Sequence, residues 1–429
     1  MQKFSSFQKA IESNVFTFLL FFVMLVTLAH QAFADFAYVA NNGTNTVSVI
    51  NTATNTVVAT ITVGTSPAEV AITPNGNFAY VTNTGSDTVS VIRTSDNTVI
   101  ATIPVATFPA GIAITPNGNF AYVTIAKVAG EVSVINTTTN TVVGPPIVVG
   151  NLPDGIAITP NGAFAYVANY AGSNVSVINT SSNTAVATIP VQTNPLAVAI
   201  TPNGNFAYVA NWLSDTVSVI HTPSNTVVAT IPVGDGPGAL AITPIGNFVY
   251  VTNQHDGTVS VIRTSNNTVI ATIPVGNDPE GIAITPDGNF AYVTNYVDNN
   301  VSVINTATNT VVGPAISVGT GPLGIAFLSS IIPPPIPLIP APPTNLTGHQ
   351  KKNDFGTVFE YFNLLKWEAS PSSIAGYVIY RDGKKIANLN ASALGYEDHN
   401  RKKDRSFLYS VAAVDANGSE SSFINVEVK

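Results

Sequence analysis

The sequence predicts an all-β protein, and three observations lead to that fold class. The phrase ITPNGNFAYV occurs three times verbatim, at Ile72–Val81, Ile114–Val123 and Ile200–Val209. Each unit holds four short runs that are rich in β-branched residues and bounded by turn residues. The phenylalanine of the phrase recurs every 42 or 44 residues, at Phe36, Phe78, Phe120, Phe164, Phe206, Phe248 and Phe290. A period in the forties with four strands per unit is typical of a propeller blade, so we expect a seven-bladed β-propeller of four-stranded blades.

The repeated phrase is best explained as a hairpin. Proline sets φ early in the turn Thr-Pro-Asn-Gly-Asn, and Asn-Gly tolerates positive φ later in it. In the Phe-Ala-Tyr-Val strand that follows, Phe and Tyr point to one face of the sheet while Ala and Val point to the other. Because both faces are apolar, the sheet must be buried on both sides, as blade-on-blade packing requires.

The order of the strands within a blade follows from proline. Six of the seven fourth runs contain proline, while Thr62 fills that place in the first unit. Proline cannot donate to a strand ladder, so the fourth run is predicted to be the outer edge strand and the small-residue GIAI run the innermost one.

The two ends of the repeat region are complementary. The first unit, Asp35 to Val63, lacks a GIAI run, and the last ends in GIAFLSS, Gly324 to Ser330. We therefore expect the C-terminal run to supply the innermost strand of the first blade. A linear solenoid is the competing interpretation, but the complementary ends favour a closed ring.

The N-terminal segment predicts export. Lys3 and Lys9 precede an apolar run, Val15 to Ala29, which ends at Ala32-Phe33-Ala34. This is the layout of a signal peptide over residues 1–34, whose removal would leave no transmembrane span and a periplasmic, cell-surface or extracellular protein. An uncleaved membrane anchor is the alternative. The chain contains no cysteine, which excludes disulfides, c-type haem attachment and thiol-based sites.

The composition changes after the repeats. Residues 35–330 contain 3 Lys or Arg against 13 Asp or Glu, whereas residues 331–429 contain 11 against 10. Residues 331–343, IIPPPIPLIPAPP, predict an extended spacer of about 40 Å at ~3.1 Å per residue. Residues 344–429 show short alternating strands and an Asp382-Gly383 hairpin turn, which indicates a separate small β-sandwich.

Two family resemblances follow from these motifs. The sequences YVTN, at Tyr80, Tyr250 and Tyr292, and YVAN, at Tyr38, Tyr166 and Tyr208, resemble the YVTN-repeat β-propellers of exported and surface-layer-type proteins, and Tyr122 to Ile125 departs from them. That resemblance implies a seven-bladed propeller outside the cytoplasm and no single shared activity. The C-terminal region resembles a fibronectin type III module, on Trp367, Tyr377, Tyr380 and Tyr409, with Trp367 and Tyr409 expected in the core and at the tyrosine corner.

Differences between the units concentrate in two sets of loops that are expected on one face of the disc. We call this face the varied face, and the face with the nearly constant TPNGN and NTxTNT turns the constant face. Binding residues commonly lie on loops held by a rigid frame. Simple drift in tolerant loops would produce the same pattern. The candidate binding residues are Tyr170, Trp212, His255, Tyr296, Lys127 and Phe108.

Three carboxylates are expected near the axis of the ring. Glu69, Asp154 and Glu280 come from different blades and could together hold a cation such as Ca²⁺ through oxygen ligands. No spaced ligand motif supports a metal there, and no other cofactor is expected.

These features favour a non-enzymatic binding or scaffold protein whose partner is an envelope or extracellular protein or glycan. A lactonase-type hydrolase with a metal-activated water at the channel mouth is the alternative. Nucleic acid is not expected as a partner, because residues 35–330 are net negative by 10, from 13 acidic and 3 basic residues. Few charges among many Thr and Asn residues leave self-association possible.

Overall fold

The computed structural model describes residues 35–328, 342–354, 359–370, 374–399, 401–403, 405–414, 420–421 and 423–428. The predicted signal peptide and most of the predicted spacer lie outside this range. The chain divides into two compact units with the boundary between Ile331 and Ile332. Among the described residues, no helix combines the length and the apolar character that crossing a bilayer requires.

The first unit is the predicted β-propeller, and its strands form seven antiparallel sheets. Blade 1 consists of β1 (Phe36–Asn41), β2 (Thr46–Asn51), β3 (Thr56–Thr62) and β30 (Pro322–Leu328), and blade 2 of β4 (Pro67–Ile72), β5 (Phe78–Asn83), β6 (Thr88–Arg93) and β7 (Thr98–Pro104). Blade 3 consists of β8 (Pro109–Ile114), β9 (Phe120–Ile125), β10 (Glu131–Asn136), β11 (Thr141–Val142) and β12 (Ile147–Val148). Blade 4 consists of β13 (Pro153–Ile158), β14 (Phe164–Asn169), β15 (Asn174–Asn179) and β16 (Thr184–Pro190).

Blades 5 to 7 repeat the same arrangement. Blade 5 consists of β17 (Pro195–Ile200), β18 (Phe206–Asn211), β19 (Thr216–His221) and β20 (Thr226–Pro232). Blade 6 consists of β21 (Pro237–Ile242), β22 (Phe248–Asn253), β23 (Thr258–Arg263) and β24 (Thr268–Pro274). Blade 7 consists of β25 (Pro279–Ile284), β26 (Phe290–Asn295), β27 (Asn300–Asn305), β28 (Thr310–Val311) and β29 (Ile316–Ser317). In blades 3 and 7 the outer strand is split in two, because Gly144 and Gly313 adopt positive φ just before prolines.

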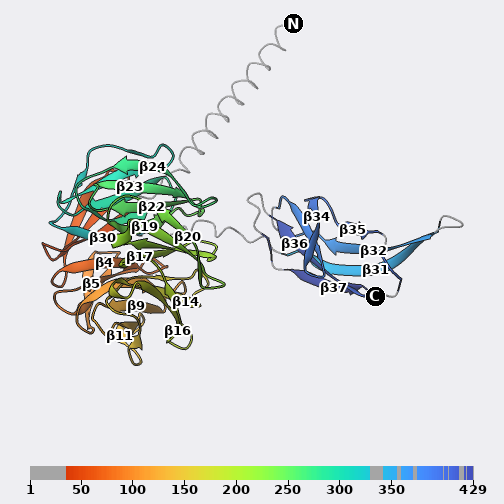
Figure 1. Cartoon of the computed structure of the whole chain (residues 1–429), viewed down its shortest axis with the longest axis horizontal. Helices are drawn as coiled ribbons and strands as arrows, with labels where there is room; N and C mark the ends of the chain where they lie inside the picture. Colours follow the sequence, from red (N-terminus) through yellow and green to blue (C-terminus); the bar gives the residue numbers. More distant parts are fainter. Residues whose placement is uncertain are drawn as a thin grey trace, which may run out of the picture. The chain divides into compact units, whose positions relative to one another are not determined.

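The ring closes as the sequence predicted. β30 pairs with β1 in the sheet order β3-β2-β1-β30, so the last propeller strand is the innermost strand of the first blade. Figure 1 shows β30 beside β4 of the second blade, with the ends of the propeller sequence side by side. The proline-bearing fourth runs are outer strands, which confirms the assignment made from proline.

A tyrosine-to-asparagine hydrogen bond joins every pair of neighbouring blades. The tyrosine lies in the second strand, and its hydroxyl donates to the side-chain oxygen of an asparagine in the constant-face turn of the next blade, at 2.5 to 2.9 Å. The pairs are Tyr38 with Asn97, Tyr80 with Asn140, Tyr122 with Asn183, Tyr166 with Asn225, Tyr208 with Asn267, Tyr250 with Asn309 and Tyr292 with Asn55. We call these seven contacts the Tyr–Asn latches.

Each latch explains two residue choices in the repeat. All seven asparagines have positive φ, between 51° and 56°, a conformation that asparagine tolerates better than most residues. The tyrosine ring is buried between blades, and burial raises the pKa of Tyr38 to about 12, so its hydroxyl stays protonated as a donor at neutral pH. The Tyr292–Asn55 latch joins the last blade to the first.

The threonine that follows Tyr-Val in four of the blades forms a second bridge between blades. Thr124 accepts a hydrogen bond from the Gly111 N–H and donates one to the Asp154 carbonyl of the next blade, and Thr252 does the same for the Ala239 N–H and the Glu280 carbonyl. Blades with YVA have alanine here and cannot form this bridge. Thr82 likewise accepts from the Glu69 N–H at 3.0 Å, so threonines fix the main chain at all three carboxylates predicted near the axis.

The second unit is a small β-sandwich. One sheet has the order β31-β32-β35, from β31 (Thr344–Asp354), β32 (Phe359–Glu368) and β35 (Gly395–Asp398). The other has the order β34-β33-β36-β37, from β33 (Gly376–Arg381), β34 (Lys384–Asn390), β36 (Phe407–Val414) and β37 (Ile424–Val428). Asp382 and Gly383 both have positive φ at the β33–β34 turn, as expected of an Asp-Gly hairpin.

Trp367 and Tyr409 both lie in the core shared by the two sheets. The Tyr409 hydroxyl donates to the Asp398 side chain at 2.6 Å and accepts from Asn363 at 2.9 Å. In a tyrosine corner the hydroxyl bonds to the main chain. The Tyr409 hydroxyl instead bonds to side chains, because the buried Asp398 carboxylate accepts its hydrogen bond.

Loss of the closing latch should destabilise the propeller. Without the Tyr292 hydroxyl, the part-buried Asn55 Oδ1 has lost its donor. We therefore expect Tyr292→Phe to lower the free energy of unfolding by roughly 1–2 kcal/mol, measured by denaturant unfolding. Asn55→Gly keeps the backbone conformation and should cost a similar amount, whereas Asn55→Ala adds backbone strain and should cost about 1 kcal/mol more. The double variant Tyr292→Phe/Asn55→Gly should cost less than the sum of its parts, and additivity would contradict the latch.

Candidate functional site

The varied face carries both sets of divergent loops, which hydrogen-bond to each other. The Thr84 N–H donates to the Ser66 carbonyl, the Trp212 N–H to Asn194 and the Tyr296 N–H to Asp278, at 2.8 to 3.0 Å. In each case one residue follows the second strand of a blade and the other precedes the first. These bonds therefore tie together the two varied-face loops of one blade.

Three predicted residues form an aromatic arc across blades 4 to 6. The rings of Tyr170 and Trp212 are 6.3 Å apart, and His255 meets the Trp212 ring edge-on at 5.2 Å. Tyr170 and Trp212 each begin a short 3₁₀ turn, Tyr170–Gly172 and Trp212–Ser214, which places the two rings alike on adjacent blades. We call Tyr170, Trp212 and His255 the aromatic arc.

A hydrogen-bonded chain connects the arc to the centre of the ring. The Trp212 indole N–H donates to Gln254 Oε1 at 2.6 Å, and Gln254 Nε2 donates to Glu280 Oε2 at 2.7 Å. The indole is therefore held in one orientation from its polar edge. Any ligand that displaces Gln254 also changes the hydrogen bonding of Glu280.

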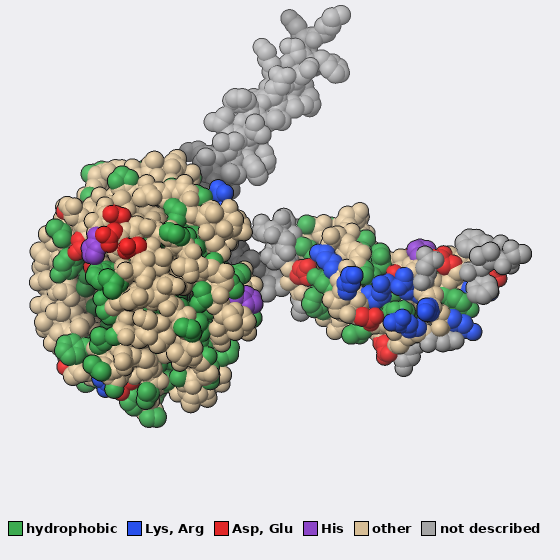
Figure 2. All heavy atoms as spheres, viewed as in Figure 1, with side chains coloured by type: hydrophobic (Ala, Val, Ile, Leu, Met, Phe, Trp, Pro, Cys, Tyr) green, Lys and Arg blue, Asp and Glu red, His purple; other side chains and the backbone are tan. Residues whose placement is uncertain are grey.

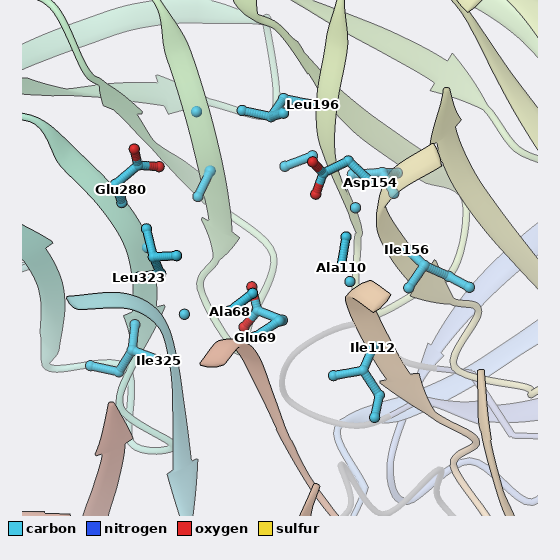
Figure 3. A pocket seen from close by; sticks show the side chains of 18 of the residues that line it. Ala68, Glu69, Ala110, Ile112, Asp154, Ile156, Leu196, Glu280, Leu323 and Ile325 are labelled. Carbon is cyan, nitrogen blue, oxygen red and sulfur yellow. The ribbon is translucent and has the colours of Figure 1, made fainter. Parts of the chain in front are cut away.

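The centre of the ring is a cavity of about 660 Å³, formed where the innermost strands converge. Glu69, Asp154, Glu280 and Phe108 line it, together with Gln254. Figure 3 shows the three carboxylates entering the cavity from different strands, among Ala, Leu and Ile side chains. A volume of this size suits a small molecule or the end of a polymer chain.

The three carboxylates have raised pKa values. Burial raises the pKa of Glu69 and of Glu280 to about 7 and that of Asp154 to about 6. The negative charge of Asp278 and then that of Asp154 raise the pKa of Glu280 further, and Asp154 also raises that of Glu69. Hydrogen bonds from the Val70 N–H to Glu69 and from Gln254 to Glu280 oppose the shifts. These carboxyls therefore change charge near neutral pH.

The carboxylates do not occupy equivalent positions. Asp154 and Glu280 are the second residues of β13 and β25, whereas Glu69 is the third residue of β4, where the other blades have Gly or Ala. Among the described residues, no group of three or more His, Cys, Asp or Glu side chains is arranged to hold a metal ion. A cation bound here would need water or ligand oxygens besides these carboxylates.

The remaining candidates are spread around the ring. Phe108 is 57% exposed at the cavity mouth, with a positive φ and its N–H bonded to Asp87. Tyr296 lies in blade 7 and its ring packs on Gly321 of the closing segment. Lys127 forms a 2.7 Å ion pair with Glu131 of its own blade. None of the three belongs to the aromatic arc.

Two residues of the site were missed by the sequence reasoning. Gln254 joins Trp212 to Glu280, and Asp235 forms a 2.8 Å contact with His255. The contact with Asp235 raises the pKa of His255, with smaller contributions from Asp278 and Asp215. Gln254 aligns with Tyr170 and Trp212 directly after the asparagine of the repeat, and that alignment could have identified it.

A model of the YNCE-like β-propeller family matches residues 22–331. The chain is similar to hydrazine synthase of Kuenenia stuttgartiensis, with 25% identity, a TM-score of 0.58, and coverage of 63% of this chain and 92% of that one. It is also similar to a functionally unknown protein from Desulfotomaculum acetoxidans, with 20% identity, a TM-score of 0.62 and coverage of 68% and 99%.

A third similar structure is the periplasmic gluconolactonase of Pseudomonas aeruginosa, with 17% identity, a TM-score of 0.60 and coverage of 68% and 98%. The second and third similarities concern the fold alone. No curated protein matches the chain.

The raised carboxyl pKa values predict a pH-dependent stability. Between about pH 4.5 and 7 the folded chain binds more protons at Glu69 and Glu280 than the unfolded chain does, so stability should fall as pH rises through this window. We expect Glu280→Gln to stabilise the propeller at pH 7.5 by roughly 1–2 kcal/mol, allowing for water in the channel, and to have little effect near pH 5.

Denaturant unfolding at the two pH values measures this difference. Asp96→Asn is the matched control, because hydrogen bonds from Thr98 lower the pKa of this surface carboxyl and its removal should bring no gain at pH 7.5. An equal effect of Glu280→Gln at both pH values would contradict the assignment.

Proposed function

The chain belongs to the YNCE-like β-propeller family, and from that premise we propose that it is an exported, non-enzymatic binding protein of the cell envelope or surface. It recognises a glycan or a protein through the varied face of the propeller, and the second unit acts as a further recognition module. The fold by itself does not decide this function, so the proposal rests on the varied face.

The aromatic arc is the observation that carries the proposal. Tyr170, Trp212 and His255 lie on three successive blades, and the Trp212 indole is oriented through Gln254 towards the cavity. Aromatic rings fixed beside hydrogen-bonding groups suit a sugar, whose ring presents an apolar face and hydroxyls at its edge. The constant face carries the Tyr–Asn latches and has no comparable arc among the described residues.

The type of repeat, the type of the second unit and the location of the protein also belong to this proposal. We infer that the repeats are YVTN repeats and that the second unit is of the fibronectin type III kind, on the strength of its two-sheet core around Trp367. Export rests on residues 1–34, with a periplasmic, cell-surface or extracellular destination. Self-association at the envelope is compatible with the sparse charge of the propeller.

Binding to the varied face should depend on the arc. With the full chain and isolated cell-envelope material, we expect Trp212→Ala and Tyr170→Ala each to weaken saturable binding about tenfold or more, because aromatic anchors dominate such contacts. Periodate oxidation of the sugars in the envelope material distinguishes a glycan, whose binding would be lost, from a protein.

The matched control is Ile245→Ala, which removes a 78% exposed apolar side chain from a constant-face turn. Equal losses in Ile245→Ala and Trp212→Ala would argue for nonspecific apolar adhesion and against the proposed site.

A lactonase-type hydrolase is the second candidate, favoured by the raised pKa of Glu280 in a cavity of ligand size. A carboxylate of this kind could take a proton from a water that attacks the lactone carbonyl, whereupon the ring C–O bond breaks and the hydroxy acid forms. Ca²⁺ would assist by polarising the carbonyl oxygen.

As a non-enzymatic protein, the full chain should not hydrolyse glucono-1,5-lactone faster than buffer does, with or without added Ca²⁺. Hydrolysis is followed by acid release at constant pH. Turnover that disappears in Glu280→Gln and persists in Trp212→Ala would establish the hydrolase instead.

A further inference from the structure

The second unit carries a surface of opposite charge to the propeller. Figure 2 shows Lys and Arg side chains gathered on one side of the second unit, whereas acidic side chains surround a histidine on the propeller. Residues 401–405, Arg-Lys-Lys-Asp-Arg, contribute four of the basic groups. The acidic residue of this run, Asp404, lies outside the described residues. The sequence run alone would be an ordinary solvated loop, so its surroundings decide its role.

Three guanidinium groups converge on one buried aromatic ring. Arg381 and Arg401 each lie 5.8 Å from the centre of the Phe407 ring, and Arg405 lies 5.1 Å from it. Phe407 is only 6% exposed, because it packs in the core of the sandwich and the guanidiniums lie against its remaining side. Arg381 comes from the end of β33, while Arg401 and Arg405 come from the segment that leads into β36. We call Arg381, Arg401 and Arg405 the arginine cluster.

A single buried carboxylate orders the cluster. Asp398 is 6% exposed, accepts a 2.7 Å hydrogen bond from Arg381, and lies 3.5 Å from Arg401 Nε. Arg401 Nε also donates to the His399 carbonyl at 2.7 Å. Asp398 thus holds Arg381 and Arg401 in place. Guanidiniums held in this way lose little freedom when they bind an anion.

Two further carboxylates, Asp382 and Glu427, lie on segments next to the cluster, and their hydrogen bonds to neutral groups leave them charged. Asp382 accepts the Leu408 N–H at 3.0 Å, and Glu427 bonds to Ser406. Lys402 and Lys403 are exposed on the same segment as Arg401 and Arg405. Around the ring of Phe407, the described charges therefore have a positive balance.

We propose that the arginine cluster, with Lys402 and Lys403, binds the carboxylate groups of an acidic polysaccharide. Guanidinium forks match carboxylates in geometry and bind them in bidentate fashion. Stacking of nucleic-acid bases needs an accessible aromatic face, and Phe407 has none because it packs in the core and against the arginines. This inference names the ligand class of the second unit and rests on the proposed recognition role, but not on the aromatic arc.

Binding of the full chain to immobilised polygalacturonate tests the proposal, with neutral dextran and double-stranded DNA as comparison surfaces. We expect Arg405→Gln to weaken binding to polygalacturonate about tenfold and Arg405→Lys to lose less, because lysine keeps the charge without the fork. Arg405 is exposed, and its substitution should leave the unfolding temperature unchanged.

The matched control is Lys366→Gln, which removes one exposed positive charge from β32. Its strand pairing places Lys366 opposite Gly395, while Asp398 lies opposite Asn363. We expect less than about a twofold effect, because the lost charge lies outside the cluster and is screened by solvent. Raising NaCl from about 50 mM to about 300 mM should weaken the wild-type complex strongly.

Three results would overturn the proposal. One is an equal loss in Lys366→Gln and Arg405→Gln, and another is binding to DNA as tight as to polygalacturonate. The third is retention of full binding by Arg405→Gln together with Lys402→Gln. Trp212→Ala should bind polygalacturonate normally, so failure of the propeller proposal and failure of this one are distinguishable.

Discussion

The structure depends on one polar contact that is repeated around the ring, the hydrogen bond from a buried tyrosine hydroxyl to an asparagine of the next blade. Apolar packing between sheets is non-directional and would tolerate sliding. The tyrosine bond is directional and expensive to leave unmade, so it sets the register of each blade against its neighbour. Because the acceptor asparagine also has positive φ, the turn that carries it can change very little. The constant face is constant in this chain because it holds the ring together.

The opposite face carries no Tyr–Asn latch. Its loops are held by main-chain bonds, such as that from the Trp212 N–H to Asn194, and by bonds between blades, such as that from the Ser66 N–H to the Asn45 side chain. Main-chain bonds do not depend on the side chain, so the residue after the repeat asparagine can be Thr84, Tyr170, Trp212 or Gln254 without loss of the frame. A rigid ring with free side-chain choice at one rim is well suited to building a binding surface. The threonine bridges extend this frame to the carbonyls of Asp154 and Glu280.

Much of the fold could be predicted from the sequence, because the period, the proline-bearing edge strands and the complementary ends are local or repetitive signals. The site was less accessible. Trp212, Gln254 and Glu280 come from different repeats, and their contacts depend on the curvature of the ring rather than on spacing. Threonine and alanine after Tyr-Val look interchangeable in sequence, yet only threonine can bridge blades. The arginine cluster was hidden for the same reason, since strand pairing brings Arg381 to the run at Arg401.

The charge contrast between the two units has a physical consequence for how the chain would act. A propeller with 3 basic and 13 acidic residues between positions 35 and 330 repels the anions proposed to bind the arginine cluster, so the two proposed recognition surfaces would select different ligands. If both proposals hold, the spacer predicted for residues 331–343 would join two modest affinities for the same envelope, and the second binding event would become effectively intramolecular. A spacer of about 40 Å gives this gain only when both ligands lie within its reach. Two weak, chemically distinct surfaces on one chain would therefore bind best where both ligands occur together, and poorly where either occurs alone.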